Sequence, residues 1–281
     1  MAIRIITDST SDIMPQEAVA LGIEVVPLKT VFGETVYREN VDITHAEFFE
    51  KLAASNKLPT TSQPAPADFL PFFEEAKKAG DDVICLLISG VLSGTVQSAE
   101  IAKGICEYEN IYIIDTLTTV VGMRALVTLA LQMCEKGLPA KEIASNLEES
   151  KSRITLYAMV DTLEYLHKGG RLSTASKVLG GILNMKPIIT IDEGAIKVVS
   201  KARGVENAMN AILELIGDEP GEHPDLPIFY GYTANDEACE LFRVKANAHY
   251  GFTNSTIHSV GSVVGTHAGP NAFVIVYLKN K

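Results

Sequence analysis

Strand-like and helix-like segments alternate along the first half of this 281-residue sequence, and this alternation limits the fold more than any other feature. A short apolar run at residues 3–6 ends in a polar loop, after which a helix is predicted from Pro15. Apolar strands are predicted at residues 83–88 and 111–114, each followed by a helix. Strands separated by helices indicate a mostly parallel sheet covered on both faces. We therefore expect an N-terminal α/β domain over residues 1–153.

The second half of the chain has a different pattern. Residues 154–160 are predicted to form a strand, and residues 187–191 and 195–199 flank an acidic turn with glycine, which is typical of a β-hairpin. Two further helices and three further strands are predicted after the hairpin. We expect a C-terminal α/β domain over residues 154–281.

Four segments carry more specific expectations. Residues 23–32 are predicted to form a single strand, and residues 117–136 a helix. The segment 58–66 is expected to lack regular structure because three prolines interrupt it. Residues 265–270 are predicted to form a polar loop before the last strand.

The composition, 47% hydrophobic and 21% charged, indicates a globular protein with a substantial core. Its net charge of −11 argues against a nucleic-acid-binding protein. The charge is uneven, because residues 168–203 hold seven basic and two acidic side chains, a net +5. Within this stretch Lys197, Lys201 and Arg203 are candidates for docking an acidic partner or anionic phospholipid. The alternative is a solvated hairpin face.

Cofactor signals are missing from the sequence. It contains no GxxxxGK[ST] loop and no GxGxxG after the first strand, and its histidines form no cluster with acidic residues that predicts a metal site. The four cysteines are far apart and lie in apolar stretches, which is typical of reduced core residues. The first residues lack a long apolar signal segment. We therefore expect a cytoplasmic protein with no metal and no cofactor.

Three polar segments stand where parallel α/β folds place ligands, after strands or before helices. They contain Thr61, Ser93 and His267 in segments that also hold glycine or proline, and small residues let a backbone approach a ligand closely. Taken singly, residues such as Thr61, Ser93 and Thr266 are more often turn or capping residues than ligand contacts. A serine esterase with Ser93 as nucleophile and His267 as base is an alternative, although the glycine before Ser93 stands one position too early for GxSxG.

Five motifs taken together resemble the DegV family, the fatty-acid-binding subunits of bacterial fatty acid kinase. They occur in order and at the spacing of the family, from residue 3 to the C-terminus. The motifs are Ile5-Ile6-Thr7-Asp8-Ser9-Thr10-Ser11-Asp12, Pro59-Thr60-Thr61-Ser62-Gln63-Pro64, Leu92-Ser93-Gly94-Thr95 with Gln97-Ser98-Ala99, Lys168-Gly169-Gly170-Arg171, and Thr266-His267-Ala268-Gly269-Pro270.

The resemblance implies a two-domain α/β protein that holds a long-chain fatty acid such as palmitate in a buried tunnel and is not itself an enzyme. It implies that Thr61 and Ser93 bind the carboxylate, with His267 and Thr266 close by and Arg171 in the supporting polar network. It further implies that a separate ATP-binding kinase subunit phosphorylates the carboxylate. The protein would then carry the product to a membrane surface that it touches transiently.

Overall fold

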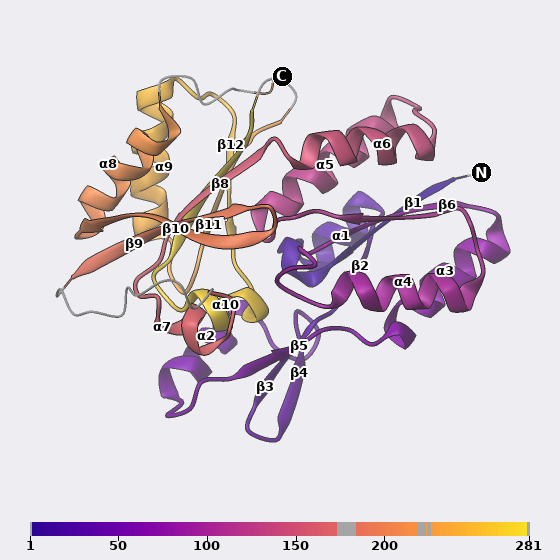
Figure 1. The fold of residues 1–281 in the computed structure, drawn as a ribbon, viewed down its shortest axis with the longest axis horizontal. Coiled ribbons are helices and arrows are strands. Elements are labelled where there is room, and N and C mark those ends of the chain that lie inside the picture. Colours follow the sequence, from indigo (N-terminus) through magenta and orange to yellow (C-terminus); the bar gives the residue numbers. More distant parts are fainter. Residues whose placement is uncertain (1, 173–183, 218–222, 224–225, 280–281) are drawn as a thin grey trace.

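Three β-sheets form the framework of the computed structural model, which describes residues 2–172, 184–217, 223 and 226–279 (Figure 1). The first and third sheets are built from residues before 116, and the second from residues after 153. The mixed α/β fold predicted from the sequence is confirmed. The boundary near residue 153 coincides with the start of the second sheet, and the division into two domains there stays a prediction.

The first sheet has four parallel strands in the order β2-β1-β6-β7. Its strands are β1 (Ile3–Asp8), β2 (Glu24–Val26), β6 (Asp82–Leu87) and β7 (Ile111–Asp115). The flanking helices are α1 (Pro15–Leu21), α3 (Pro66–Ala79), α4 (Thr95–Cys106), α5 (Val121–Glu135) and α6 (Ala140–Lys151). Residues of α5 and α6 pack on one face of the sheet, and residues of α3 and α4 on the other. Both faces are thus buried, as the nearly continuous apolar strands require.

The second sheet has six strands in the order β10-β9-β8-β13-β11-β12, antiparallel except for the pair β11 and β12. Its strands are β8 (Ile154–Met159), β9 (Met185–Asp192), β10 (Ala195–Arg203), β11 (Ile228–Tyr232), β12 (Ser255–Ser259) and β13 (Phe273–Leu278). The helices α8 (Val205–Ile216) and α9 (Glu237–Tyr250) lie against one face (Figure 1). Alternation along β8 sends Tyr157 and Met159 towards these helices and Leu156 and Ala158 towards the opposite face.

The third sheet is small and antiparallel, in the order β4-β3-β5, and it corrects two expectations. Residues 23–32 form two strands in different sheets, β2 and β3 (Lys29–Phe32), because Pro27 lies between them and the chain crosses over. The segment 58–66 contains a strand, β5 (Thr60–Ser62), which pairs with β3. Prolines are tolerated there because β5 is a short edge strand with Pro59 and Pro64 outside it. Strand β4 spans Thr35–Arg38.

Short helices complete the structure. Helix α2 (His45–Ala54) begins at a capping box of Thr44 and Glu47, and α7 (Glu164–Lys168) precedes Arg171. Residues 265–270 are not all loop, because α10 spans Ser262–Ala268. Helix α5 starts four residues later than predicted, since Leu117 and Val120 adopt positive φ values of 53° and 49° that no helix allows.

The β9–β10 hairpin tip connects the first and second sheets. Ser89, which follows β6, donates its hydroxyl to the carbonyl of Gly194 at 2.8 Å. Gly194 has a φ of 79°, and a Cβ placed there would lie 2.5 Å from Ser89 Oγ. Glycine is therefore required both by the backbone and by the close approach of the two sheets.

We predict that Gly194→Ala lowers the free energy of unfolding by about 2–3 kcal/mol, through the strained φ and the contact with Ser89. Gly33→Ala is the matched control, because Gly33 also turns a hairpin at a φ of 60° but has open space around it. Gly33→Ala should lower the free energy of unfolding only by the cost of the backbone strain, about 1 kcal/mol. Urea unfolding of both variants measures the difference, and equal losses would contradict the proposed steric contact.

Candidate functional site

A cavity of about 340 Å³ lies between the sheets, within the size range of small-molecule sites. Much of its wall is aliphatic and comes from the face of the second sheet opposite α8 and α9. Representative wall residues are Leu156, Ala158, Ile189, Ile191, Val260 and Val274. Such a wall favours an apolar ligand, because it offers dispersion contacts and removes apolar surface from water.

Four of the five residues assigned to ligand binding from the sequence line this cavity: Thr61, Ser93, Arg171 and His267. Thr61 lies on β5, Ser93 precedes α4, Arg171 follows α7 and His267 is in the last turn of α10. The fold thus brings four separate motifs to one place. Thr266 is not among the lining residues, and its hydroxyl donates to the carbonyl of Ser262 at 2.8 Å. A direct role of Thr266 stays a prediction.

The imidazole of His267 and the hydroxyl of Thr61 are hydrogen-bonded, with 2.9 Å between Nε2 and Oγ1. Nδ1 of His267 is buried against the backbone of Gly169 and has no hydrogen-bond partner among the residues that the structure describes. Burial, with the nearby charge of Arg171, lowers the pKa of His267 to about 4, so the ring is neutral at pH 7. The Nε2–H tautomer avoids an unpaired buried N–H and leaves the Thr61 hydroxyl hydrogen free to donate to a ligand.

Arg171 is the charged side chain among the described residues that line the cavity, since His267 is neutral. Its Nε donates to the carbonyl of Leu92 at 3.0 Å and its Nη1 to the carbonyl of Gly169 at 2.8 Å. These bonds tie the segment before Ser93 to the backbone that contacts His267. Arg171 therefore connects two parts of the polar cluster and gives the site a positive charge, which suits an anionic ligand group.

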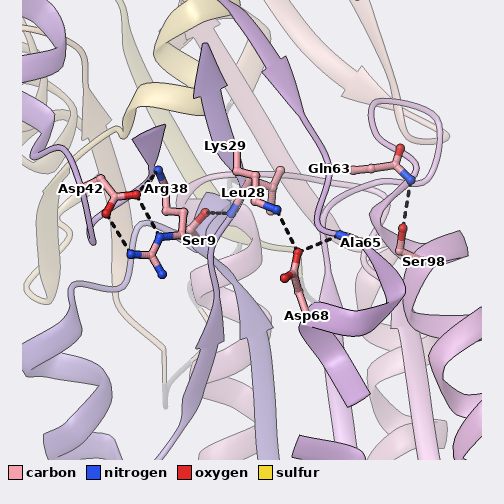
Figure 2. Close-up of polar contacts among 9 residues, drawn as sticks. All are labelled: Ser9, Leu28, Lys29, Arg38, Asp42, Gln63, Ala65, Asp68 and Ser98. Atoms are coloured by element: carbon pink, nitrogen blue, oxygen red, sulfur yellow. Dashed lines mark hydrogen bonds and ion pairs between the residues drawn. The ribbon is translucent and has the colours of Figure 1, made fainter. Parts of the chain in front are cut away.

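Gln63 is a lining residue that the sequence analysis did not select. Its side-chain amide donates to Ser98 Oγ at 2.9 Å and to the carbonyl of Gly94 at 3.1 Å, and Figure 2 shows it extending towards Ser98. A Cβ at Gly94 would overlap the Gln63 amide, so this glycine makes room for the contact. Gln63 thereby holds the Ser93 loop beside β5. Gln63 belongs to one of the five motifs, which could have drawn attention to it. A side-chain amide is neither an acid, a base nor a nucleophile, however, so nothing marked it as a site residue.

Neighbouring contacts anchor the third sheet to the first. Lys29 of β3 forms an ion pair with Asp68 at 3.1 Å, and the same Asp68 oxygen accepts from the backbone of Ala65 at 2.8 Å (Figure 2). The amide of Leu28 donates to Ser9 Oγ at 2.9 Å (Figure 2). The strand pair that carries Thr61 is therefore fixed at the end where Lys29 pairs with Ser62.

Comparison with known families decides the identity of this fold and site. A family model described as "Uncharacterised protein, DegV family" matches residues 2–280. The chain belongs to the DegV family. Its sequence is 35% identical over 270 residues to a DegV domain-containing protein of Caldanaerobacter subterraneus, with 96% of each chain covered.

Two solved structures of DegV proteins are similar over the whole chain. A DegV family protein of Thermus thermophilus, described as binding fatty acid, has a TM-score of 0.91 and 33% identity, with 99% of this chain and 100% of that chain covered. DegV of Bacillus subtilis, described as a fatty acid binding protein, has a TM-score of 0.86 and 30% identity, with all of both chains covered. The resemblance found in the five sequence motifs is therefore confirmed at the level of the family.

The geometry of this DegV protein gives little support to the esterase alternative. Ser93 Oγ is hydrogen-bonded to Thr95 Oγ1 at 2.8 Å, while His267 uses Nε2 for Thr61. An orienting carboxylate would have to meet Nδ1 of His267, and that atom has no hydrogen-bond partner. The Ser93–His267 pair thus lacks both contacts of a triad.

The basic residues assigned to docking lie away from the cavity, on β10 at the edge of the second sheet. Lys197, Lys201 and Arg203 are exposed, and Lys197 pairs with Asp192 at 2.5 Å. Elsewhere in the +5 stretch, Lys168 pairs with Glu164 and Lys186 with Asp161, and Lys177 lies outside the described residues. Part of the positive charge is thus neutralised locally, and Lys201 and Arg203 are the stronger docking candidates.

Other potential reactive groups are structural in character. All four cysteines are free thiols, three of them buried. Within the described ranges, no group of three or more His, Cys, Asp or Glu side chains is placed to hold a metal ion. Among the described helices, none is long and apolar enough to cross a bilayer.

We predict that His267 stays neutral well below the pH at which a free imidazole protonates. Its pKa of about 4 in the folded protein lies below the value near 6.5 for an unfolded chain, so protons bind the unfolded state preferentially between these values. The stability contributed by the neutral ring is therefore lost as the pH falls below about 6.5. Nitrogen-detected NMR of the ring measures the titration, with the urea-unfolded protein as control. A folded-state midpoint near 6.5 would contradict the burial argument.

Proposed function

We propose that this DegV protein binds one long-chain fatty acid, with the acyl chain in the cavity and the carboxylate at Thr61, Ser93, Arg171 and His267. The observation that carries the proposal is the joining of a mainly aliphatic wall with this polar cluster in one cavity. The similar proteins of Thermus thermophilus and Bacillus subtilis are described as fatty acid binding, which supports the same ligand class here. The protein acts as a carrier without turnover of its own.

Affinity comes mainly from the acyl chain. Burying a CH₂ group contributes about 0.8 kcal/mol, so a sixteen-carbon chain contributes roughly 10 kcal/mol before ordering costs. A hydrogen bond to a charged group contributes about 1.5–3 kcal/mol. The polar cluster therefore serves orientation more than affinity.

The cluster is suited to present a carboxylate without neutralising it by a bidentate ion pair. Thr61 offers a hydroxyl hydrogen, since its oxygen accepts from His267 in the favoured tautomer. Arg171 contributes charge while two of its nitrogens are used by backbone carbonyls. A carboxylate oxygen held in this way keeps its nucleophilic character.

The proposed reaction takes place on a separate ATP-binding kinase subunit, as the family resemblance implies. A carboxylate oxygen attacks the γ-phosphorus of ATP, the bond to the β–γ bridging oxygen breaks, and an acyl phosphate and ADP result. The carrier then exchanges lipid with a membrane surface. Both activities place the protein in the cytoplasm, transiently at the membrane.

The direct test is mass spectrometry of an organic extract of the purified protein, before and after loading with palmitate. We expect one fatty acid per chain, with nothing of that kind released from a matched sample of an unrelated protein purified the same way. A lipid-free protein that does not take up palmitate would overturn the proposal.

We predict that Ser93→Ala, Thr61→Ala and His267→Ala each weaken palmitate binding by about tenfold or less, because the acyl chain supplies most of the affinity. The loss of acyl-phosphate formation with kinase and ATP should be about a hundredfold, because a misplaced carboxylate rarely meets phosphorus in line. Thr128→Val is the control, since it removes a hydroxyl that bonds the carbonyl of Arg124 within α5. Variants that hold palmitate and are phosphorylated at the wild-type rate would show that these residues do not form the carboxylate site.

We also predict that Arg203→Glu leaves palmitate binding intact but slows phosphorylation or exchange with anionic vesicles several-fold at low salt. Exposed charges at the rim of an interface act mainly on association, and salt weakens this effect. Lys141→Glu, an exposed lysine on α6, is the charge-matched control. Equal kinetics of the two variants would identify the stretch as a solvated face.

A further inference from the structure

The helix that carries His267 is held at its start by acidic residues distant in sequence. The residue before its first turn is Gly261, which has no side chain to cap the helix. Glu39 Oε1 instead accepts from the backbone N–H of Val263 at 2.7 Å and from Ser262 Oγ at 3.0 Å. Asp12 Oδ1 accepts from the backbone N–H of Gly261 at 2.9 Å. A carboxylate from another part of the chain thus takes the place of the usual capping side chain.

Gly261 leaves the space that this arrangement needs. A Cβ at this position would lie 2.4 Å from Glu39 Oε1 and 2.9 Å from His45 Nε2. A serine or aspartate here could cap the helix locally, but it would displace the Glu39 carboxylate. Helix α10 is therefore preceded by a glycine, and Glu39 from a distant part of the chain supplies its cap.

The distant cap requires the burial of acidic groups. Glu39 and Asp12 are 1% and 2% exposed, and within the described part of the chain the second carboxylate oxygen of each meets no hydrogen-bond donor. The groups that face them are Asp8 from β1, His45 from α2 and Arg124 from α5, and burial raises the pKa of Glu39 to about 7. Burying charge in this way costs stability, which a purely local cap would avoid.

Both ends of α10 are tied to the same three-stranded sheet. At the start, Thr30 on β3 donates to Ser262 Oγ at 3.0 Å, and Glu39 follows β4 directly. At the end, His267 meets Thr61 on β5, which pairs with β3. A seven-residue helix is too short to fix its own position, so these ties determine where the imidazole lies relative to Thr61.

We propose that Glu39, supported by Asp12, is a positioning residue of the carboxylate site, whose cap on α10 holds His267 in register with Thr61. The proposal rests on the proposed function, because positioning matters for a bound carboxylate. It assigns a role to two buried acids that do not line the cavity. The stability lost by burying these two acids is then a consequence of holding the site in a fixed geometry, since stability and function often conflict at functional sites.

The first test is Glu39→Gln, which keeps the shape of the side chain and removes the charge. At pH 8 the folded protein no longer has to bury an ionised Glu39, so its unfolding midpoint should stay equal or rise. Its neutral amide oxygen is a weaker acceptor, so α10 should be less well fixed. We expect changed ring-nitrogen signals of His267 in the ligand-free protein and about tenfold slower acyl-phosphate formation at saturating kinase, with palmitate still bound. Glu24→Gln, at a partly buried acid on β2 of the first sheet, is the control and should leave the His267 signals and the phosphorylation rate unchanged.

The second test separates a local cap from the tie between helix and sheet. Glu39→Ala should lower the unfolding midpoint, and the added change Gly261→Ser should restore it by supplying a local cap. The double variant should still show the altered His267 signals and the slow phosphorylation, because Glu39 no longer links α10 to the third sheet. Wild-type signals and rates in Glu39→Gln, or full recovery of both in the double variant, would overturn the proposal. If the wild-type protein does not bind palmitate, the proposed function fails, whereas the His267 signals of the ligand-free variants still test the positioning role.

Discussion

The three sheets of this DegV protein meet at the first turn of α10, and the cavity depends on that junction. Asp12 comes from the segment that follows β1 of the first sheet, Thr30 from β3 and Glu39 from the residue after β4 of the third sheet, and α10 follows β12 of the second. The aliphatic wall is made mostly by the second sheet, whereas Thr61 and Ser93 come from the other two parts. An apolar wall and a polar cluster therefore occupy one cavity only if the relative placement of the sheets is fixed.

That placement uses polar contacts in addition to the apolar packing that α5 and the segment after β6 share with the second sheet. Ser89 reaches Gly194, Gln63 reaches Ser98, and Arg171 joins the carbonyls of Leu92 and Gly169. Hydrogen bonds are directional, so they define the orientation of the loops they join, while apolar contacts tolerate sliding. Close approaches at Gly194 and Gly94 show how near the segments must come. The residues of the sequence motifs therefore join separate parts of the fold as well as lining the ligand site.

The sequence predicted the layers of the fold well, because apolar periodicity reports burial directly. It failed where a long-range contact overrides a local signal. Prolines flank Thr60–Ser62, yet pairing with β3 makes this segment a strand. The polar segments with Thr61, Ser93 and His267 could be selected from the sequence, but only the family resemblance joined them into one carboxylate site, since nothing in the spacing of Thr61 and His267 places them 2.9 Å apart. Glu39 gave no signal, because an acid in a polar segment is normally expected at the surface.

The division between wall and cluster also explains the chemistry of the polar residues. A site that derived its affinity from a charged clamp would hold the carboxylate strongly, and each gain in binding would lower the nucleophilicity of its oxygens. In the proposed carrier the acyl chain supplies the affinity, so a site with a neutral, buried His267 and a single hydroxyl from Thr61 is sufficient. Uniform binding does not accelerate a reaction, whereas accurate placement of the reacting atom does. In the proposed arrangement the buried acids Glu39 and Asp12 therefore fix the position of α10 and do not themselves contact the carboxylate.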